Sequence, residues 1–162
     1  MFRIRALIDI PDIGVSKGDL GGLVEKEENL CNDPETLCWI GQDAQVFGEG
    51  RVECDAQIRD HAKIFGEAAV CDDAVVMEYA QVSGDSLVQN NSCISGCAEI
   101  DSAHIMGWSC IEDATVKNGA LVDDVDLIGE DVHVSGPIEL RSQTDEAVKI
   151  SGNIFIESPL AT

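Results

Sequence analysis

The sequence is poor in aromatic and in basic residues. Phe, Trp and Tyr make up 4% of the 162 residues, so the core of a folded domain has to be built from Val, Ile, Leu and Ala. Lys and Arg number 10 against 31 Asp and Glu, which gives a formal net charge of -21. Coulomb repulsion then opposes direct binding to nucleic acid or to an anionic membrane. A basic protein partner, a cation or plain solubility remain as reasons for the acidic residues.

The sequence also has no long apolar run and no paired cysteine motif. No segment approaches the roughly 18 apolar residues of a membrane span, and MFRIRALIDIP lacks the apolar core and cleavage site of a signal peptide. Seven cysteines, an odd number, favour reduced thiols and a cytoplasmic location. Cys93 and Cys97 lie four apart, but no second pair completes a zinc spacing, so no metal site is expected. The length suits one domain.

What the sequence does contain is a strict six-residue repeat. Val or Ile returns at every sixth position from residue 40 to residue 100, at Ile40, Val46, Val52, Ile58, Ile64, Val70, Val76, Val82, Val88, Ile94 and Ile100. The fifth position of each unit is Ala, Gly or Ser in ten of these eleven units, the exception being His104. A period of six excludes an α-helix and a coiled coil. Each unit is therefore predicted to be one short strand and a tight corner, with the β-branched residue inside.

A second period of eighteen residues predicts three units per coil. It aligns Phe47 with Phe65, Glu49 with Glu67 and Asp85, and Asp55 with Asp73 and Asn91. We therefore expect an all-β fold, a single-stranded, three-sided parallel β-helix over residues 40–140. The pattern slips at residues 106–110 and resumes from Cys110. Residues 1–39 are expected to form a cap of a strand and a short helix, and residues 141–162 a polar loop and a capping rung.

The hexapeptide pattern resembles the left-handed parallel β-helix of hexapeptide-repeat proteins, whose best-known members are acyltransferases. The opening segment, FRIRALIDIP…GVSKGDLGGLVEKEENL running into CWIGQDAQVFGEG, resembles bacterial and bacteriophage β-helix proteins often labelled putative transferases. The left hand is an expectation from this resemblance. So is an acyltransferase activity with acetyl-coenzyme A as donor and a histidine as general base at a trimer interface, for which the candidates are His61, His104 and His133.

Two features of the sequence depart from the acyltransferase pattern. The repeat runs through eleven units without the long projecting loop that commonly shapes an acceptor site. Between Ile64 and Leu140 the only basic residue is Lys117, whereas coenzyme A carries several phosphate charges that need cations or backbone amides. Acyl transfer is therefore the alternative hypothesis, and no cofactor is expected under the leading one.

The charge of the repeat supplies the leading hypothesis. Residues 40–140 hold 20 acidic and 4 basic residues. With strands about 4.8 Å apart, about 5.6 coils form a rod about 27 Å long with one net charge per about 1.7 Å, as in duplex DNA. We therefore expect a decoy that occupies the nucleic-acid site of a basic partner in the cytoplasm. In a phage-like setting, which the resemblance suggests, a host defence nuclease or a CRISPR-type effector is the expected target in the host cytoplasm.

Candidate surface residues follow from the same register. The predicted partner-binding residues are Glu49, Glu67, Asp85, Asp55, Asp73, Asp72, Asp123, Asp124, Asp126 and, in the slip, Trp108. Outward-pointing Phe47, Phe65 and Met77 are candidates for the contact face of a dimer or trimer. Calcium binding by Asp72 and Asp73, by Asp123, Asp124 and Asp126, or by Glu130 and Asp131 stays a third interpretation, but no recognised calcium loop is present and solvated corners are expected.

Overall fold

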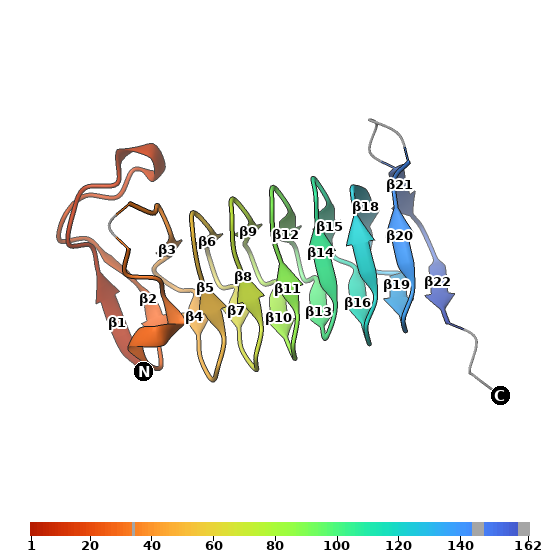
Figure 1. Cartoon of the computed structure of the whole chain (residues 1–162), viewed down its shortest axis with the longest axis horizontal. Coiled ribbons are helices and arrows are strands. Elements are labelled where there is room, and N and C mark those ends of the chain that lie inside the picture. The colour runs from red at the N-terminus through yellow and green to blue at the C-terminus, as the bar shows by residue number, and fades with distance from the viewer. Residues whose placement is uncertain (34, 144–147, 159–162) are drawn as a thin grey trace.

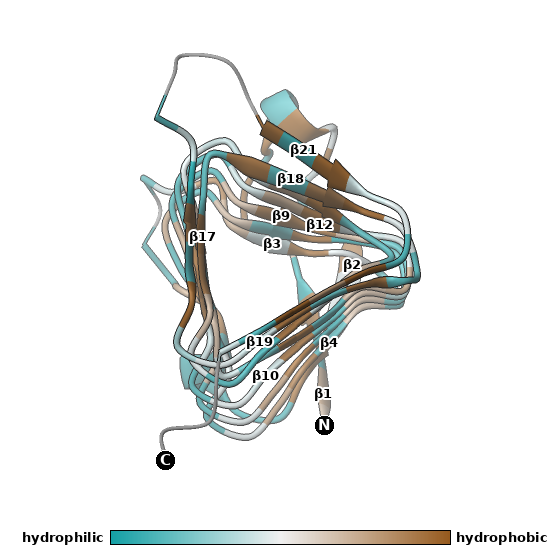
Figure 2. Ribbon diagram, turned by 90° about the vertical axis from the view of Figure 1, so that its right-hand side faces the viewer, coloured by the Kyte–Doolittle hydropathy of each residue, from teal (hydrophilic) through white to brown (hydrophobic). Residues whose placement is uncertain are grey.

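The computed structural model describes residues 1–33, 35–143 and 148–158, which form a three-sided parallel β-solenoid. Its coils stack along one axis from the N-terminal to the C-terminal end (Figure 1). Seen along this axis, three flat walls enclose a triangular cross-section (Figure 2). The predicted all-β, three-sided β-helix is thereby confirmed.

Each wall of the triangle is one sheet. Sheet 1 has nine strands, in the order β1 (Phe2–Arg5), β2 (Leu20–Val24), β4 (Gln45–Val46), β7 (Lys63–Ile64), β10 (Gln81–Ser83), β13 (Glu99–Asp101), β16 (Thr115–Lys117), β19 (Val132–Ser135) and β22 (Ile154–Glu157). Sheet 2 has six strands, β5 (Arg51–Val52), β8 (Ala69–Val70), β11 (Leu87–Val88), β14 (His104–Met106), β17 (Leu121–Asp123) and β20 (Glu139–Arg141). Sheet 3 has seven strands, β3 (Trp39–Ile40), β6 (Gln57–Ile58), β9 (Val75–Val76), β12 (Cys93–Ser95), β15 (Cys110–Glu112), β18 (Val125–Ile128) and β21 (Val148–Ser151).

The core is the row of β-branched residues that defines the repeat. All eleven first-position residues, from Ile40 to Ile100, are at most 1% exposed. The small fifth-position residues are buried beside them, and the hydroxyls of Ser86 and Ser92 donate hydrogen bonds to backbone carbonyls three residues earlier in the same corner. Removing this aliphatic surface from water is the main source of stability for a chain with so few aromatic residues.

The corners turn because their third residue adopts a left-handed backbone conformation. Gly48, Gly66 and Gly84 have φ between 63° and 71° in the corner between sheets 1 and 2. Asp72 and its equivalents in the other two corners have φ near 60°, a region in which Gly, Asn and Asp are enriched. The predicted stacking of successive coils follows from this shared geometry, and the rings of Phe47 and Phe65 lie parallel with centroids 5.1 Å apart.

The loss of register lies elsewhere than in residues 106–110. Three units have five residues, 100–104, 111–115 and 122–126, because they lack the exposed fourth residue of the corner. Residues 105–110 form a regular six-residue unit. Ala103, not His104, fills the small buried position, and His104 lies in β14 on the outside of sheet 2. Likewise Ile111 points into the core, whereas Cys110 is half-buried on the outside of sheet 3.

Both ends of the solenoid are capped by strands. At the N-terminal end β1 pairs with β2 in antiparallel fashion, and β2 continues sheet 1 by pairing with β4. The segment predicted to form a short helix is β2 followed by a 3₁₀ turn at Glu27–Asn29; a second 3₁₀ turn spans Pro11–Ile13. At the C-terminal end β21 and β22 extend sheets 3 and 1 as a last rung. Residues 144–147 of the predicted polar loop lie outside the described residues.

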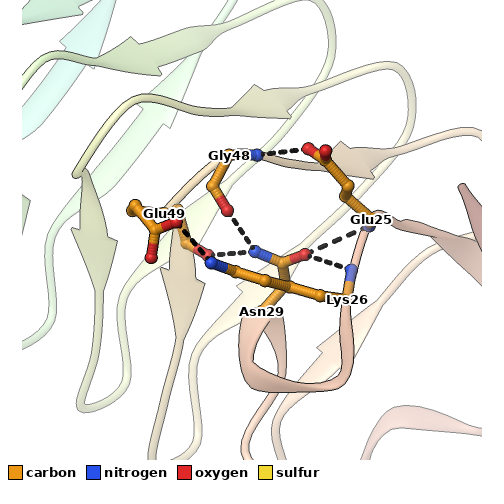
Figure 3. Close-up of polar contacts among 6 residues, drawn as sticks. Glu25, Lys26, Asn29, Gly48 and Glu49 are labelled. Atoms are coloured by element: carbon orange, nitrogen blue, oxygen red, sulfur yellow. Dashed lines mark hydrogen bonds and ion pairs between the residues drawn. The ribbon is translucent and has the colours of Figure 1, made fainter.

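Buried Asn29 joins the N-terminal cap to the first full coil (Figure 3). Its side-chain oxygen accepts hydrogen bonds from the backbone N–H groups of Glu25 and Lys26, and its amide donates to the carbonyls of Gly48 and Gly50. The side-chain amide of Asn29 thus makes all four of these hydrogen bonds, and an apolar side chain at this position could make none of them. Within the described part of the chain, no helix has the length and apolar character needed to cross a membrane.

The stacked glycines of the corner between sheets 1 and 2 provide a test of this packing. A Cβ on Gly66 would lie 2.9 Å from the backbone nitrogen of Gly84, whereas one on Gly48 would approach no atom closer than 3.4 Å. We expect Gly48→Ala to lower the free energy of unfolding by about 1 kcal/mol, the cost of a left-handed Ala, and Gly66→Ala to lower it by roughly 1–3 kcal/mol more through crowding. Urea denaturation of both variants measures the difference, and equal losses would contradict the close stacking.

Candidate functional site: carboxylates along the corners

The acidic residues of the solenoid are concentrated at the corners of the triangle. The corner between sheets 1 and 2 carries Glu49, Glu67 and Asp85. The corner between sheets 2 and 3 carries Asp55, Asp72, Asp73 and Asp124. The corner between sheets 3 and 1 carries Asp43, Asp60, Glu78, Asp113, Glu130 and Asp131. The acidic charge is thus spread over the three corners of the solenoid. A single partner protein would contact one sheet and the two corners beside it.

Many of these carboxylates hold the fold together. Seven of them accept a hydrogen bond from a backbone N–H group of a neighbouring coil, at distances of 2.7–3.1 Å: Asp55, Asp60, Asp72, Glu78, Asp113, Asp124 and Asp126. Asn90 makes the same kind of bond to Gly107. These N–H groups belong mostly to the left-handed turns, where the carboxylate oxygen takes the place of a ladder carbonyl. The recurrence of Asp or Asn at the third position of a unit is the signal in the sequence for this role.

A second group of carboxylates has no such role. Glu53, Glu67, Asp73 and Asp85 are exposed, and among the described residues no hydrogen bond or ion pair involves their side chains. Glu49 forms an ion pair with Lys26 (Figure 3). The hydrogen bond and the charge of Lys26 lower the pKa of the Glu49 carboxyl below its ordinary value. Together these five groups flank or lie on sheet 2.

The outer surface of sheet 2 and its two flanking corners form what we call the acidic face. The middle of the sheet is occupied by half-buried small and apolar side chains, Ala69, Cys71, Leu87, Met106 and Leu121. Toward the N-terminal end a cavity of about 380 Å³ opens, lined by Glu49, Arg51, Glu53, Glu67 and Ala69. The acidic face therefore combines an apolar centre with a row of carboxylates along each side.

Other predicted partner-binding residues lie at the far end of this face. Trp108 is 72% exposed at the fourth position of the corner between sheets 2 and 3, in line with Asn91 and Asp73 of the two preceding coils. Its backbone N–H donates to the Asp124 carboxylate over 2.8 Å. Asp123, at the end of β17, lies 3.9 Å from the guanidinium of Arg141, which also contacts Glu139. Asp126 lies on sheet 3 and is separate from the acidic face.

The three histidines occupy separate places. His61 stacks on Tyr79 with ring centroids 5.1 Å apart, as the eighteen-residue period predicts, at the corner between sheets 3 and 1. His133 stacks on Phe155 at 4.7 Å on sheet 1. His104 lies exposed on the acidic face between Leu87 and Leu121. Among the described residues, no carboxylate is hydrogen-bonded to any of the three imidazoles, so the predicted role as general base stays a prediction.

A cavity of about 590 Å³ lies between the N-terminal cap and the corner between sheets 3 and 1. Trp39, Asp43, Arg59 and Asp60 are among its lining residues. Arg59 is its one basic residue, and two of the three guanidinium nitrogens, Nε and Nη2, donate to the side-chain oxygen of Gln57. One cation already engaged in this way offers little to the phosphates of a coenzyme A donor.

The remaining candidate groups do not converge. Phe47 and Phe65 stack beside the corner between sheets 1 and 2, whereas Met77 lies beside the corner between sheets 3 and 1, so the three do not make one oligomer face. Over the described ranges, no group of three or more His, Cys, Asp or Glu side chains is arranged to hold a metal ion. Of the acidic groups considered for calcium, Asp72 and Asp73 share one corner and Glu130 and Asp131 another, whereas Asp123 and Asp126 lie in β17 and β18. Comparison with family models and with curated proteins gave no match.

Asp55 and Asp73 test the division of carboxylates into two groups. They occupy the same column one coil apart, but only Asp55 accepts a backbone hydrogen bond, 2.7 Å from the nitrogen of Leu37. We expect Asp55→Ala to lower the free energy of unfolding by about 1.5–3 kcal/mol, the range for a hydrogen bond to a charged group. Asp73→Ala should change it by less than about 0.5 kcal/mol, as for other surface sites. Chemical denaturation of both variants provides the comparison, and similar losses would remove the distinction.

Proposed function

We propose that the protein is an acidic binding protein whose acidic face occupies the basic groove of a nucleic-acid-binding partner. The observation that carries this proposal is the gathering of exposed carboxylates, unused by the fold, on both sides of the apolar side chains of sheet 2. Glu53, Glu67, Asp73 and Asp85 lie on or beside sheet 2 and, within the described residues, make no side-chain bond. Like charges stacked on neighbouring strands destabilise a sheet. These carboxylates have no structural role that would explain their presence, whereas a role in binding would explain it.

The spacing of the charges is close to that of a duplex. Strands of adjacent coils lie about 4.8 Å apart, so two rows along the acidic face present up to one carboxylate per about 2.4 Å of axis. Duplex DNA presents one phosphate per about 1.7 Å, also from two rows. The acidic face therefore presents a somewhat lower charge per length than duplex DNA does. The value of about 1.7 Å per net charge for the whole rod overstates the charge that one partner contacts.

The centre of the acidic face favours binding over solubility as the reason for the charge. A surface shaped for solubility alone has no need of several apolar side chains gathered between its charged rows. Here Leu87, Met106 and Leu121 lie between the two acidic rows, and Trp108 projects at the margin. An apolar centre with a charged rim is the usual anatomy of a protein interface, and tryptophan is enriched among its anchors.

The partner class rests on a different argument. A host defence nuclease or a CRISPR-type effector carries a basic groove, and such a target follows from the resemblance to bacteriophage β-helix proteins. The charge and the apolar strip support a basic partner of any origin. Binding in the cytoplasm, where the cysteines stay reduced, is part of the same proposal.

The proposal is tested by neutralising the unused carboxylates. The chain is immobilised, a bacterial lysate is passed over it at low salt, and each retained protein is purified and assayed for DNA or RNA binding with and without the chain. We expect the chain to inhibit nucleic-acid binding by its partner and to release the partner as salt rises. Glu53→Gln with Glu67→Gln and Asp85→Asn should weaken partner affinity by about tenfold or more, since each close charge contributes about 0.5 kcal/mol or more.

A matched control separates a specific face from diffuse charge. Asp43→Asn with Glu130→Gln and Asp131→Asn changes the net charge equally but lies at the corner between sheets 3 and 1. This variant should retain partner affinity within about twofold. Equal weakening by both triple variants, or no retention of a nucleic-acid-binding protein at low salt, would overturn the proposal.

A further inference from the structure

Cys93 and Cys110 lie directly opposite each other on neighbouring strands of sheet 3. Their Cα atoms are register partners in the parallel pair β12 and β15, and both side chains are half-buried on the outer surface of the sheet. Neighbouring strands are about 4.8 Å apart, which lies within the roughly 4.4–6.8 Å between Cα atoms that a disulfide requires. Because both residues precede an inward-pointing Ile, their Cβ atoms point to the same side.

The two thiols differ in acidity because each acts on the other. The Cys110 thiol donates a hydrogen bond to the sulfur of Cys93 and lowers the pKa of Cys93 to about 7, and Arg59 acts in the same direction. Burial, Glu112 and Glu78 oppose this shift. The same hydrogen bond, burial, the nearby Cys93 charge, Asp126 and Glu112 raise the pKa of Cys110. At pH 7 about half of the Cys93 side chains are therefore thiolates, each beside a protonated Cys110.

The other cysteines lack this arrangement. Cys71 lies opposite Glu53 in the register of β5 and β8, so Cys54 and Cys71 are one residue out of step. Burial is the main cause that raises the pKa of Cys71 to about 11. The Cys38 thiol donates to the backbone carbonyl of Cys31 and also interacts with the Cys31 side chain, but burial is the main cause that raises the pKa of Cys38, and the two cysteines are not register partners on paired strands. Cys97 is exposed at a corner.

We propose that Cys93 and Cys110 form a reversible dithiol–disulfide site that exchanges with small-molecule disulfides of the glutathione class. The Cys93 thiolate attacks one sulfur of the oxidant, forms a mixed disulfide and expels one thiolate, which takes up a proton. Cys110 then loses its proton to solvent, attacks the Cys93 sulfur and expels the second thiolate. The two protein thiols are oxidised to one disulfide, and the oxidant is reduced to two thiols.

This site is independent of the proposed binding function. Sheet 3 is a different wall of the triangle from sheet 2, which carries the acidic face. A disulfide here would covalently join two consecutive coils in the middle of the rod. It would act on the solenoid whether or not the acidic face binds a basic protein, so the two proposals fail separately.

Peptide mapping tests the proposal directly. The full chain is incubated with oxidised glutathione at pH 7.5, alkylated and digested without reduction. We expect a Cys93–Cys110 crosslinked peptide, lighter by two hydrogens than the separate peptides and lost on treatment with dithiothreitol. Cys110→Ser should instead accumulate glutathione on Cys93, because no second thiol resolves the mixed disulfide. The control Cys54→Ser with Cys71→Ser should form the crosslink at the rate of the unchanged chain.

Three outcomes would overturn the site. One is a mixed disulfide on Cys93 that persists in the unchanged chain without a crosslink to Cys110. Another is a crosslink between Cys54 and Cys71 that forms as fast as one between Cys93 and Cys110, since register would then confer no preference. Reaction at neither Cys93 nor Cys110, while exposed Cys97 is modified, would also contradict it.

The pH dependence of alkylation provides a second readout. Iodoacetamide reacts with the thiolate, so a lowered pKa keeps Cys93 reactive at pH 7.5 and makes its rate fall as the pH drops below about 7. Cys110→Ala removes the hydrogen-bond donor and should move the midpoint of the Cys93 profile upward, toward the ordinary value of about 8.5. Cys110→Ser, which keeps a donor, should move it less. An unchanged midpoint of the Cys93 profile in Cys110→Ala would contradict a contact between the two thiols.

Discussion

The rest of the structure depends on a left-handed residue at the third position of every corner. This conformation lets the chain turn between two sheets within two or three residues, which keeps the strands short and returns each β-branched residue to the core. It is unfavourable for most side chains, by about 1–2 kcal/mol. The corner between sheets 1 and 2 meets this constraint mostly with glycine, as at Gly66, and the other two corners meet it with Asp, Asn, Glu, Cys or further glycines, as at Asp72.

The same constraint explains part of the acidic composition. A left-handed corner leaves backbone N–H groups without a ladder carbonyl, and the carboxylates of Asp60 and Glu78 accept from the next coil in succession. Acidic residues therefore accumulate wherever a corner repeats, whatever the protein binds. The carboxylates that we propose for binding are those without a structural role that lie beside sheet 2, such as Glu67 and Asp85. Net charge by itself does not distinguish the two groups.

The sequence predicts the periodic part of this fold and misses its exceptions. Eleven equally spaced Val and Ile residues define both the strand and the number of sides, because a core position cannot be moved without burying a polar neighbour. Five-residue units are harder to see, since they delete the exposed fourth residue and leave the core sequence intact. Ile100 and Ile105 continue the core, yet the lost residue displaces His104 from its predicted position and transfers the apparent slip to residues 106–110. The side-chain bond of Asp55 to Leu37 comes from a fourth-position residue and lacks the third-position signal that marks most of the other bonds between coils.

The shortened units also create the cysteine pair. A constant eighteen-residue coil would place Cys93 opposite Ile111, and the loss of one residue at 100–104 brings Cys110 opposite it instead. Cys110 ends the corner that presents Trp108, and both backbone N–H groups are held by carboxylates of the next coil, Asp124 and Asp126. In a solenoid each coil contacts only its neighbours, so a bond between Cys93 and Cys110 acts chiefly on this corner. The proposed oxidation site and the margin of the acidic face thus lie on two different walls that one short segment, residues 107–110, joins.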